Sequence, residues 1–269
     1  MATKLGVVVI HGMGSQDPDF AEDMIEELND RVKDLGKDPD TISWKPIYWA
    51  NILAARQTEY LRNAKRLGDL DYIGLRKFML SAFGDASAYQ RVNSGNNNTT
   101  YKKIHRRVAR DIKSLYVTGL QSEPKPLIVL AHSLGGHIMS NYIWDMQQSG
   151  DPGLSAFERM EKLSGIVTFG CNIPFFTFAY DVVKPIEFPP VTLTAALKRK
   201  AKWLNFYDPD DVLGYPLKAI NTDYRKVVTK DIPINVGGVF SSWNPMAHGG
   251  YWTDNSFTKP VAKYIASFL

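Results

Sequence analysis

Four continuous apolar runs constrain the fold of this chain more than any other feature of its sequence. They read LGVVVIHG (5–12), PLIVLAHS (126–133), LSGIVTFG (163–170) and WLNFYD (203–208). A strand with one wet face alternates apolar and polar residues. These runs do not alternate, so they predict strands that are buried on both faces of a parallel sheet. Two weaker strands are expected nearer the sheet edges because each contains a proline, at 41–49 and 231–238.

Helical patterns fall between the predicted strands. Apolar residues recur at helical spacing in four segments, 18–36, 100–120, 134–148 and 254–268. Strands that alternate with helices predict βαβ units and a parallel sheet. We therefore expect an α/β fold, a three-layer α/β/α sandwich around a mostly parallel sheet of about six strands.

Two stretches of the chain are too long to be ordinary links between a strand and a helix. They are residues 50–99 and 171–201, within what we expect to be a single domain, 1–269. The first contains YIGLRKFMLSAF (72–83), for which we expect an extra helix. Both inserts should rise at the carboxyl ends of strands, where such sheets bind ligands, so they could form a cap or lid. The second carries aromatic residues that either line a substrate pocket or cover the sheet: Phe175, Phe176, Phe178 and Tyr180.

The charge balance limits the partners we expect. The chain has 32 Lys and Arg against 28 Asp and Glu, and its positive charge is concentrated at 101–113 and 197–202. The first segment has the pattern of an amphipathic helix with a solvated basic face. It has no interleaved aromatic residues for base stacking, so we expect no nucleic-acid partner. The sequence leaves a peripheral membrane contact open without indicating one, and it also leaves the oligomeric state open.

The cysteine content and the N-terminal residues bear on the compartment. Cys171 is the sole cysteine, so the chain contains no internal disulfide and suits a reducing compartment. MATKLGVVVIHGMG (1–14) lacks the regions of a secretory leader, and no stretch approaches the ~18 apolar residues of a spanning helix. The expected location is cytoplasmic.

The run at 126–133 ends abruptly in AHSLGG (131–136). A serine nucleophile must project its hydroxyl above a sheet while the chain turns sharply into a helix, and the turn leaves room only for small neighbours. Gly135 and Gly136 supply small residues after the serine, and Ala131 replaces the first glycine of the Gly-x-Ser-x-Gly pattern. We expect Ser133 to be a nucleophile. The alternative is a serine that only caps the following helix.

A serine nucleophile needs a base, and the base needs an orienting acid. After such an elbow the expected chain order is serine, acid, histidine. His248 is the candidate base because it lies in a glycine-rich loop before the last helix. The candidate acid is Asp210, the first residue past the turn made by Pro209, with Asp211 as the alternative and Asp208 third. The remaining histidines lie in turns or on helices: His11, His105, His132 and His137.

The developing oxyanion needs hydrogen-bond donors. The Leu134 N–H directly follows the nucleophile, and the Met13 N–H lies in HGMG (11–14), where Gly12 and Gly14 let the backbone approach. The alternatives for this loop are an ordinary turn or a degenerate dinucleotide loop, but residue 17 is aspartate where the full dinucleotide pattern needs glycine. The sequence contains no metal-ligand cluster, and we expect neither metal nor cofactor.

Four fragments carry a resemblance to a known family: VIHGMG, AHSLGG, DPDDVLG and AHGGYW. By their order and elements the chain resembles compact lipase- and esterase-like members of the α/β-hydrolase superfamily, over most of its length apart from the two inserts. The resemblance implies a sheet that lacks the superfamily's first two strands. It also implies the following roles: Ser133 as nucleophile, His248 as base, Asp210 as acid, and Met13 and Leu134 as oxyanion donors.

The same resemblance implies a reaction. The expected substrate is a small-molecule carboxylic ester with an apolar part, cleaved through an acyl-enzyme on Ser133. The superfamily also contains thioesterases, acyltransferases and non-catalytic members, so these remain alternatives.

Overall fold

The computed structural model describes residues 2–14, 16–91, 99–149, 151–236 and 247–269. Its frame is a six-stranded sheet in the order β2-β1-β3-β4-β5-β6, and every pairing is parallel. The strands are β1 (Leu5–Ile10), β2 (Ile42–Ile47), β3 (Leu127–His132), β4 (Leu163–Phe169), β5 (Lys202–Tyr207) and β6 (Lys230–Pro233). All six predicted strands are therefore present, although residues 237 and 238 of the last prediction lie outside the described residues.

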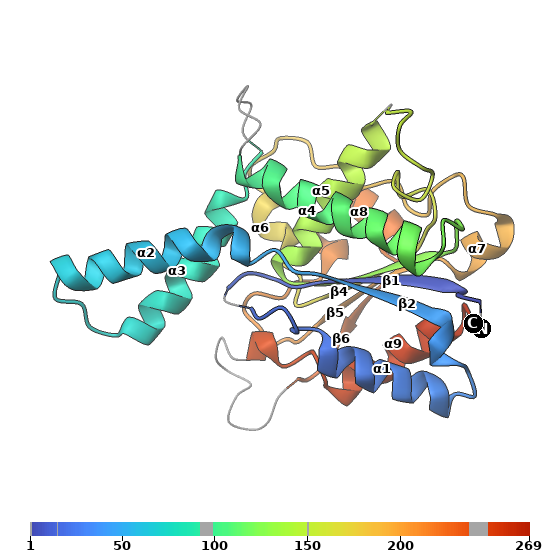
Figure 1. Ribbon diagram of the computed structural model, residues 1–269, viewed down its shortest axis with the longest axis horizontal. Helices are drawn as coiled ribbons and strands as arrows, with labels where there is room; N and C mark the ends of the chain where they lie inside the picture. Colours follow the sequence, from blue (N-terminus) through green and yellow to red (C-terminus); the bar gives the residue numbers. More distant parts are fainter. Residues whose placement is uncertain (1, 15, 92–98, 150, 237–246) are drawn as a thin grey trace.

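Helices cover both faces of the sheet, as the sequence predicts. α1 and α9 lie side by side on one face, and α4, α5 and α8 lie on the other (Figure 1). The sheet and its two helical layers form the expected α/β/α sandwich. The α-helices are α1 (Glu22–Asp34), α2 (Asn51–Leu67), α3 (Ile73–Ala88), α4 (Thr100–Ser114), α5 (Leu134–Gln148), α6 (Ile173–Thr177), α7 (Ala195–Lys200), α8 (Thr222–Val227) and α9 (Asn255–Ala266).

The central strands contribute side chains to both cores. Val8 and Val129 pack into the core beneath α4 and α5, whereas Val9 and Leu130 pack into the core beneath α1 and α9. Successive side chains of a strand point to opposite faces, so a strand covered on both sides needs apolar residues at every position. This double coverage explains why the runs in β1 and β3 are continuous.

Each edge strand carries a proline, Pro46 in β2 and Pro233 in β6. The Ile234 N–H donates a hydrogen bond of 2.9 Å to the Tyr207 carbonyl of β5. Because backbone groups alternate in direction along a strand, the nitrogen of Pro233 points away from β5. The prolines thus occupy the outer positions that the sequence analysis assigns to them.

The first insert contains a helical hairpin. α2 and α3 pack against each other and project away from the sheet at the left of Figure 1. The sequence predicts α3 but gives no sign of α2, of which only Leu53 is buried. The second insert forms α6, α7 and connecting loops after β4. Both inserts follow the carboxyl ends of strands, β2 and β4 respectively, as expected.

Candidate active site

Ser133 lies in a sharp turn between β3 and α5. Its backbone angles are φ 50° and ψ −125°, in a region that residues other than glycine rarely occupy. The Ser133 N–H donates a hydrogen bond of 3.0 Å to the Phe169 carbonyl at the end of β4, which ties the strained turn to the sheet. The chain therefore has the strand–turn–helix geometry that the AHSLGG segment predicts.

Close packing explains the small residues around Ser133. A Cβ atom on Gly12 would lie 2.5 Å from the Ser133 Cβ, and one on Gly135 would lie 2.6 Å from the His11 carbonyl oxygen. A Cβ on Gly136 would lie 2.7 Å from the sulfur of Cys171. Real Cβ atoms do not approach other atoms so closely. The glycines let α5 start directly against the strand ends while Ser133 keeps its position.

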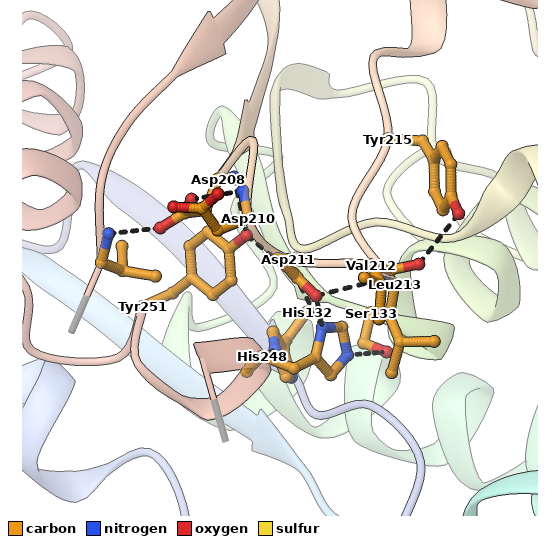
Figure 2. A network of polar contacts seen from close by, with 11 residues as sticks. His132, Ser133, Asp208, Asp210, Asp211, Val212, Leu213, Tyr215, His248 and Tyr251 are labelled. Carbon is orange, nitrogen blue, oxygen red and sulfur yellow. Dashed lines mark hydrogen bonds and ion pairs between the residues drawn. The ribbon is translucent and has the colours of Figure 1, made fainter. Parts of the chain in front are cut away.

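His248 lies between Ser133 and Asp211 (Figure 2). Its Nε2 is 2.6 Å from the Ser133 hydroxyl oxygen, and its Nδ1 is 2.9 Å from the nearer carboxylate oxygen of Asp211. With the proton of the neutral ring on Nδ1, His248 donates to Asp211 and accepts from the serine hydroxyl. Three residues far apart in the sequence thus form a continuous line of hydrogen bonds.

The Asp211 carboxylate is buried and has two further donors. The Tyr251 hydroxyl donates to it over 2.8 Å, and the Leu213 N–H donates over 3.0 Å. Burial favours the neutral carboxyl, but the hydrogen bond and charge of His248 and these donors outweigh it, so the pKa of Asp211 is lowered. Asp211 is therefore a fixed anion facing His248.

The structure corrects the expected acid. Asp210 is exposed, and its N–H donates to a carboxylate oxygen of Asp208 over 2.8 Å. The other carboxylate oxygen of Asp208 accepts the Val236 N–H, so Asp208 stabilises the turn after β5. Asp211, the next residue along, is the one whose side chain returns to the sheet edge and meets His248. The geometry therefore favours Asp211, the alternative acid, over Asp210.

His132 has a role that its position in the turn does not reveal. Burial, with a smaller effect from the nearby His248, lowers the pKa of His132 to about 3, so the ring is neutral. Its Nε2 lies 2.8 Å from the His248 carbonyl oxygen and donates to it. His132 thus holds the backbone of the loop that carries the candidate base. The position of His132 directly before Ser133 is the one sequence signal that could have indicated this role.

The loop after β1 carries the expected oxyanion donor Met13. Within the part of the chain that the structure describes, neither the Met13 N–H nor the Leu134 N–H donates a hydrogen bond. The Gly14 N–H donates to the buried carboxylate of Asp85 on α3 over 2.8 Å. His11 fixes the other end of the loop because its Nε2 accepts the Trp49 N–H over 3.0 Å. Asp85 belongs to the first insert, and Trp49 belongs to the segment that leads into it.

Two adjoining cavities, with volumes of about 300 and 260 Å³, lie between α5 and the second insert, and the smaller one is also lined by the first insert. Phe176 and Tyr180 line both of them, in keeping with a pocket role for these aromatics, whereas Phe178 is 87% exposed. His137 also lines both cavities, stacked on Phe176 at a centroid distance of 4.0 Å. Its Nε2 lies 3.1 Å from the side-chain nitrogen of Asn141, so His137 is both a packing and a polar residue of α5.

The remaining expectations concern metals, thiols and membranes. No group of three or more histidine, cysteine, aspartate or glutamate side chains among the described residues could hold a metal ion. Cys171 is fully buried, and burial raises the pKa of its thiol to about 12, so it stays protonated. None of the helices in the described ranges combines the length and apolar character needed to cross a membrane.

The likeness of this chain to known proteins is one of structure. No protein-family model matches the sequence, and a search of curated proteins finds no match. Among solved structures, the chain is similar to "a putative hydrolase of the alpha/beta superfamily" from Xanthomonas campestris pv. campestris, with 12% sequence identity and a TM-score of 0.41. The alignment covers 96% of this chain and 98% of that one. The parallel sheet and its two helical layers form an α/β sandwich (Figure 1).

Proposed function

We propose that this protein is a serine hydrolase that cleaves carboxylic esters with an apolar acyl or alcohol part. The observation that carries the proposal is the line of contacts from Ser133 through His248 to Asp211, with distances of 2.6 and 2.9 Å. A hydroxyl in this arrangement has a base within proton-transfer reach, and the base has an anion that orients it.

In the first half of the reaction, the Ser133 oxygen attacks the ester carbonyl carbon while its proton moves to His248 Nε2. Asp211 holds the Nδ1–H and stabilises the imidazolium that forms. The tetrahedral intermediate then breaks the bond to the leaving alkoxide, which takes the proton from His248. The products of this half are a free alcohol and an ester of Ser133.

In the second half, water attacks the acyl-enzyme and gives a proton to His248. Collapse of the second intermediate releases the carboxylic acid, and the proton returns to the Ser133 oxygen. In both halves the carbonyl oxygen gains negative charge, and the Met13 and Leu134 N–H groups are the donors we assign to it. Such a donor typically contributes about 10²–10³ in rate.

We assign the apolar part of the substrate to the cavity of about 300 Å³ beside α5, although neither Ser133 nor His248 is among its described lining residues. Its described lining mixes eight aromatic or aliphatic residues with six polar or charged ones, and small-molecule sites commonly combine the two kinds. The main apolar lining residues are Trp144, Ile173, Phe176, Val183 and Ile186.

A fluorophosphonate probe tests the proposal directly, because it reacts with an activated serine without needing the natural substrate. We expect labelling of the wild type, with the tag mapped to the peptide that contains Ser133, and none in Ser133→Ala. A matched control is Ser256→Ala, which removes an exposed hydroxyl on α9. Full labelling of Ser133→Ala would refute the assignment.

A chain-length series of p-nitrophenyl esters then tests the substrate class. Turnover should be abolished to background in Ser133→Ala and should rise from acetyl to medium-length acyl groups in the wild type. A parallel thioester series distinguishes ester hydrolysis from the thioesterase alternative. Labelling at Ser133 together with turnover of thioesters alone would retain the nucleophile and reject the ester substrate.

A further inference from the structure

Helix α3 has the reverse of the usual burial pattern of a surface helix. It buries Ser81, Ala82 and Asp85, whereas Leu75 and Phe83 are each 60% exposed. A helix at the surface of a water-soluble domain normally buries its large apolar residues and exposes its polar ones. The exposed side of α3 is therefore suited to contact something other than water.

The exposed apolar residues form a continuous stripe. Leu75, Met79 and Phe83 are four residues apart, so they lie on one side of α3. Tyr72 immediately precedes α3 and Leu67 ends α2, and each is 80% exposed at the tip of the hairpin. Contiguous apolar surfaces of this kind mark sites of interaction with proteins or membranes.

Positive charge gathers in the groove between the two helices. This groove, of about 530 Å³, is lined by Arg62, Lys65 and Arg66 from α2 and by Lys77 from α3. No acidic residue is among its described lining residues, and none of these four cations has an ion-pair partner in the described ranges. The hairpin thus combines an exposed apolar stripe with a cationic groove, and its exposed acidic residues lie outside the groove lining: Glu59, Asp69 and Asp71.

We propose that the α2–α3 hairpin docks on the surface of an anionic phospholipid bilayer. The stripe of Leu75, Met79 and Phe83 enters the boundary between headgroups and acyl chains, and α3 lies in the plane of the interface. The groove cations lie behind the stripe on the side of α3 toward α2, where lipid phosphates attract them. The hairpin projects from the body of the molecule, so it reaches a flat surface without obstruction from the sheet layers (Figure 1).

A second copy of the chain fits the hairpin less well than a membrane does. Two copies related by a two-fold axis would join stripe to stripe and add the positive charge of one hairpin to that of the other. Like charges at an interface oppose association, whereas an anionic bilayer complements them. The charge therefore favours the lipid surface.

The proposal does not rest on ester hydrolysis and is tested without turnover. Wild-type protein is sedimented with vesicles of phosphatidylcholine alone, or with about a quarter of the lipid replaced by phosphatidylglycerol. We expect binding at least tenfold tighter to the anionic vesicles and weaker binding as salt increases. Soluble glycerol phosphate should not displace the protein. Equal binding to both vesicles, no binding to either, or displacement by glycerol phosphate would overturn the proposal.

Two sets of substitutions assign the binding to the hairpin. The apolar set should weaken vesicle binding at least tenfold, and its residues are exposed, so the fold should persist: Leu75→Ser, Met79→Ser and Phe83→Ser. The cationic set should weaken binding to anionic vesicles and reduce its salt dependence: Arg62→Ala, Lys65→Ala and Arg66→Ala. A control set removes three exposed cations on or beside α1 and α9, on the other side of the sheet, and should bind as the wild type does: Lys33→Ala, Lys37→Ala and Lys259→Ala. Unchanged binding of both hairpin sets would overturn the proposal.

A fluorescent label gives a local readout. Because Cys171 is fully buried, Met79→Cys and Lys33→Cys each introduce one accessible thiol for an environment-sensitive dye. Anionic vesicles should shift the emission of the dye to the blue at position 79 and leave it unchanged at position 33. A concentration-dependent dimer that protects position 79 without lipid would instead assign the stripe to self-association and contradict membrane docking.

Discussion

The backbone N–H of Gly14 donates a hydrogen bond of 2.8 Å to the carboxylate of Asp85, although 71 residues separate the two in the sequence. Gln57 of α2 donates to the other carboxylate oxygen over 2.7 Å. The loop that carries Met13 is therefore held by the helical hairpin and not only by the strand that precedes it. The first insert contributes to the geometry of the site edge.

Substitution of Asp85 tests this positioning role. Asp85→Asn keeps an acceptor for Gly14, whereas Asp85→Ala removes it and frees the loop. We expect Asp85→Ala to lower kcat for a p-nitrophenyl ester by about tenfold, with a smaller change in KM, because misplacing an oxyanion donor costs less than the 10²–10³ of losing it. Asp85→Asn should stay within about twofold of the wild type. Equal loss in both variants would mean that the carboxylate acts in another way.

The same residue predicts a pH dependence of stability. Burial raises the pKa of Asp85 from 3.8 to about 6, against the opposing hydrogen bonds from Gly14 and Gln57. Between about pH 4 and 6 the native state therefore binds more protons at this site than the unfolded state does. The contribution of Asp85 to the free energy of unfolding falls as pH rises through this window, by at most about 3 kcal/mol.

Urea unfolding of the wild type and Asp85→Asn between pH 4 and 7 checks this sign. The difference in unfolding free energy between the variant and the wild type should increase with pH up to about 6 and then level off. Asp210→Asn serves as an exposed carboxylate control. A difference that stays constant with pH would show that Asp85 titrates normally.

The identity of the acid is tested by a pair of adjacent substitutions. Asp211→Asn replaces the carboxylate that faces His248 and should lower kcat by roughly 10³–10⁴, since the amide favours the wrong tautomer of the imidazole. Asp210→Asn changes an exposed side chain and should alter kcat by less than about twofold. Steady-state ester kinetics measure both. A large loss in Asp210→Asn with normal turnover in Asp211→Asn would reverse the assignment.

Gly12→Ala tests the close approach to the nucleophile. The added methyl group would lie 2.5 Å from the Ser133 Cβ and 3.1 Å from its hydroxyl oxygen, so either the loop or the elbow must move. We expect fluorophosphonate labelling to slow by at least about tenfold, because small shifts in reacting groups have large effects on rate. Gly74→Ala is the matched control, since its added methyl meets nothing within 4 Å. Normal labelling of Gly12→Ala would show that the loop yields without cost to the site.

Much of the frame could be predicted because it depends on local patterns. Strands covered on both faces have continuous apolar runs, and the elbow at Ser133 needs small residues at fixed offsets. Helix α2 gave no such signal, because it projects from the body and only Leu53 is buried. A helix without a buried face has no apolar stripe to recognise.

The contacts that complete the site could not be predicted in the same way. DPDD (208–211) places three carboxylates within four residues, and only the path of the turn decides that Asp211 returns toward His248 while Asp210 faces solvent. Tyr251 binds Asp211, which lies 40 residues away in the sequence, and Asp85 binds Gly14, which lies 71 residues away. No local sequence pattern encodes contacts between residues so far apart.

The two outer prolines also determine where the sheet ends. The Lys4 N–H donates a hydrogen bond to the Thr41 carbonyl, so alternation along the chain turns the nitrogen of Pro46 away from β1, just as that of Pro233 turns away from β5. Neither rim can offer an N–H donor at that position to an incoming strand from another molecule. Pro46 and Pro233 thereby oppose aggregation through the two edges of the sheet. They do so without removing any hydrogen bond between the strands of the sheet itself.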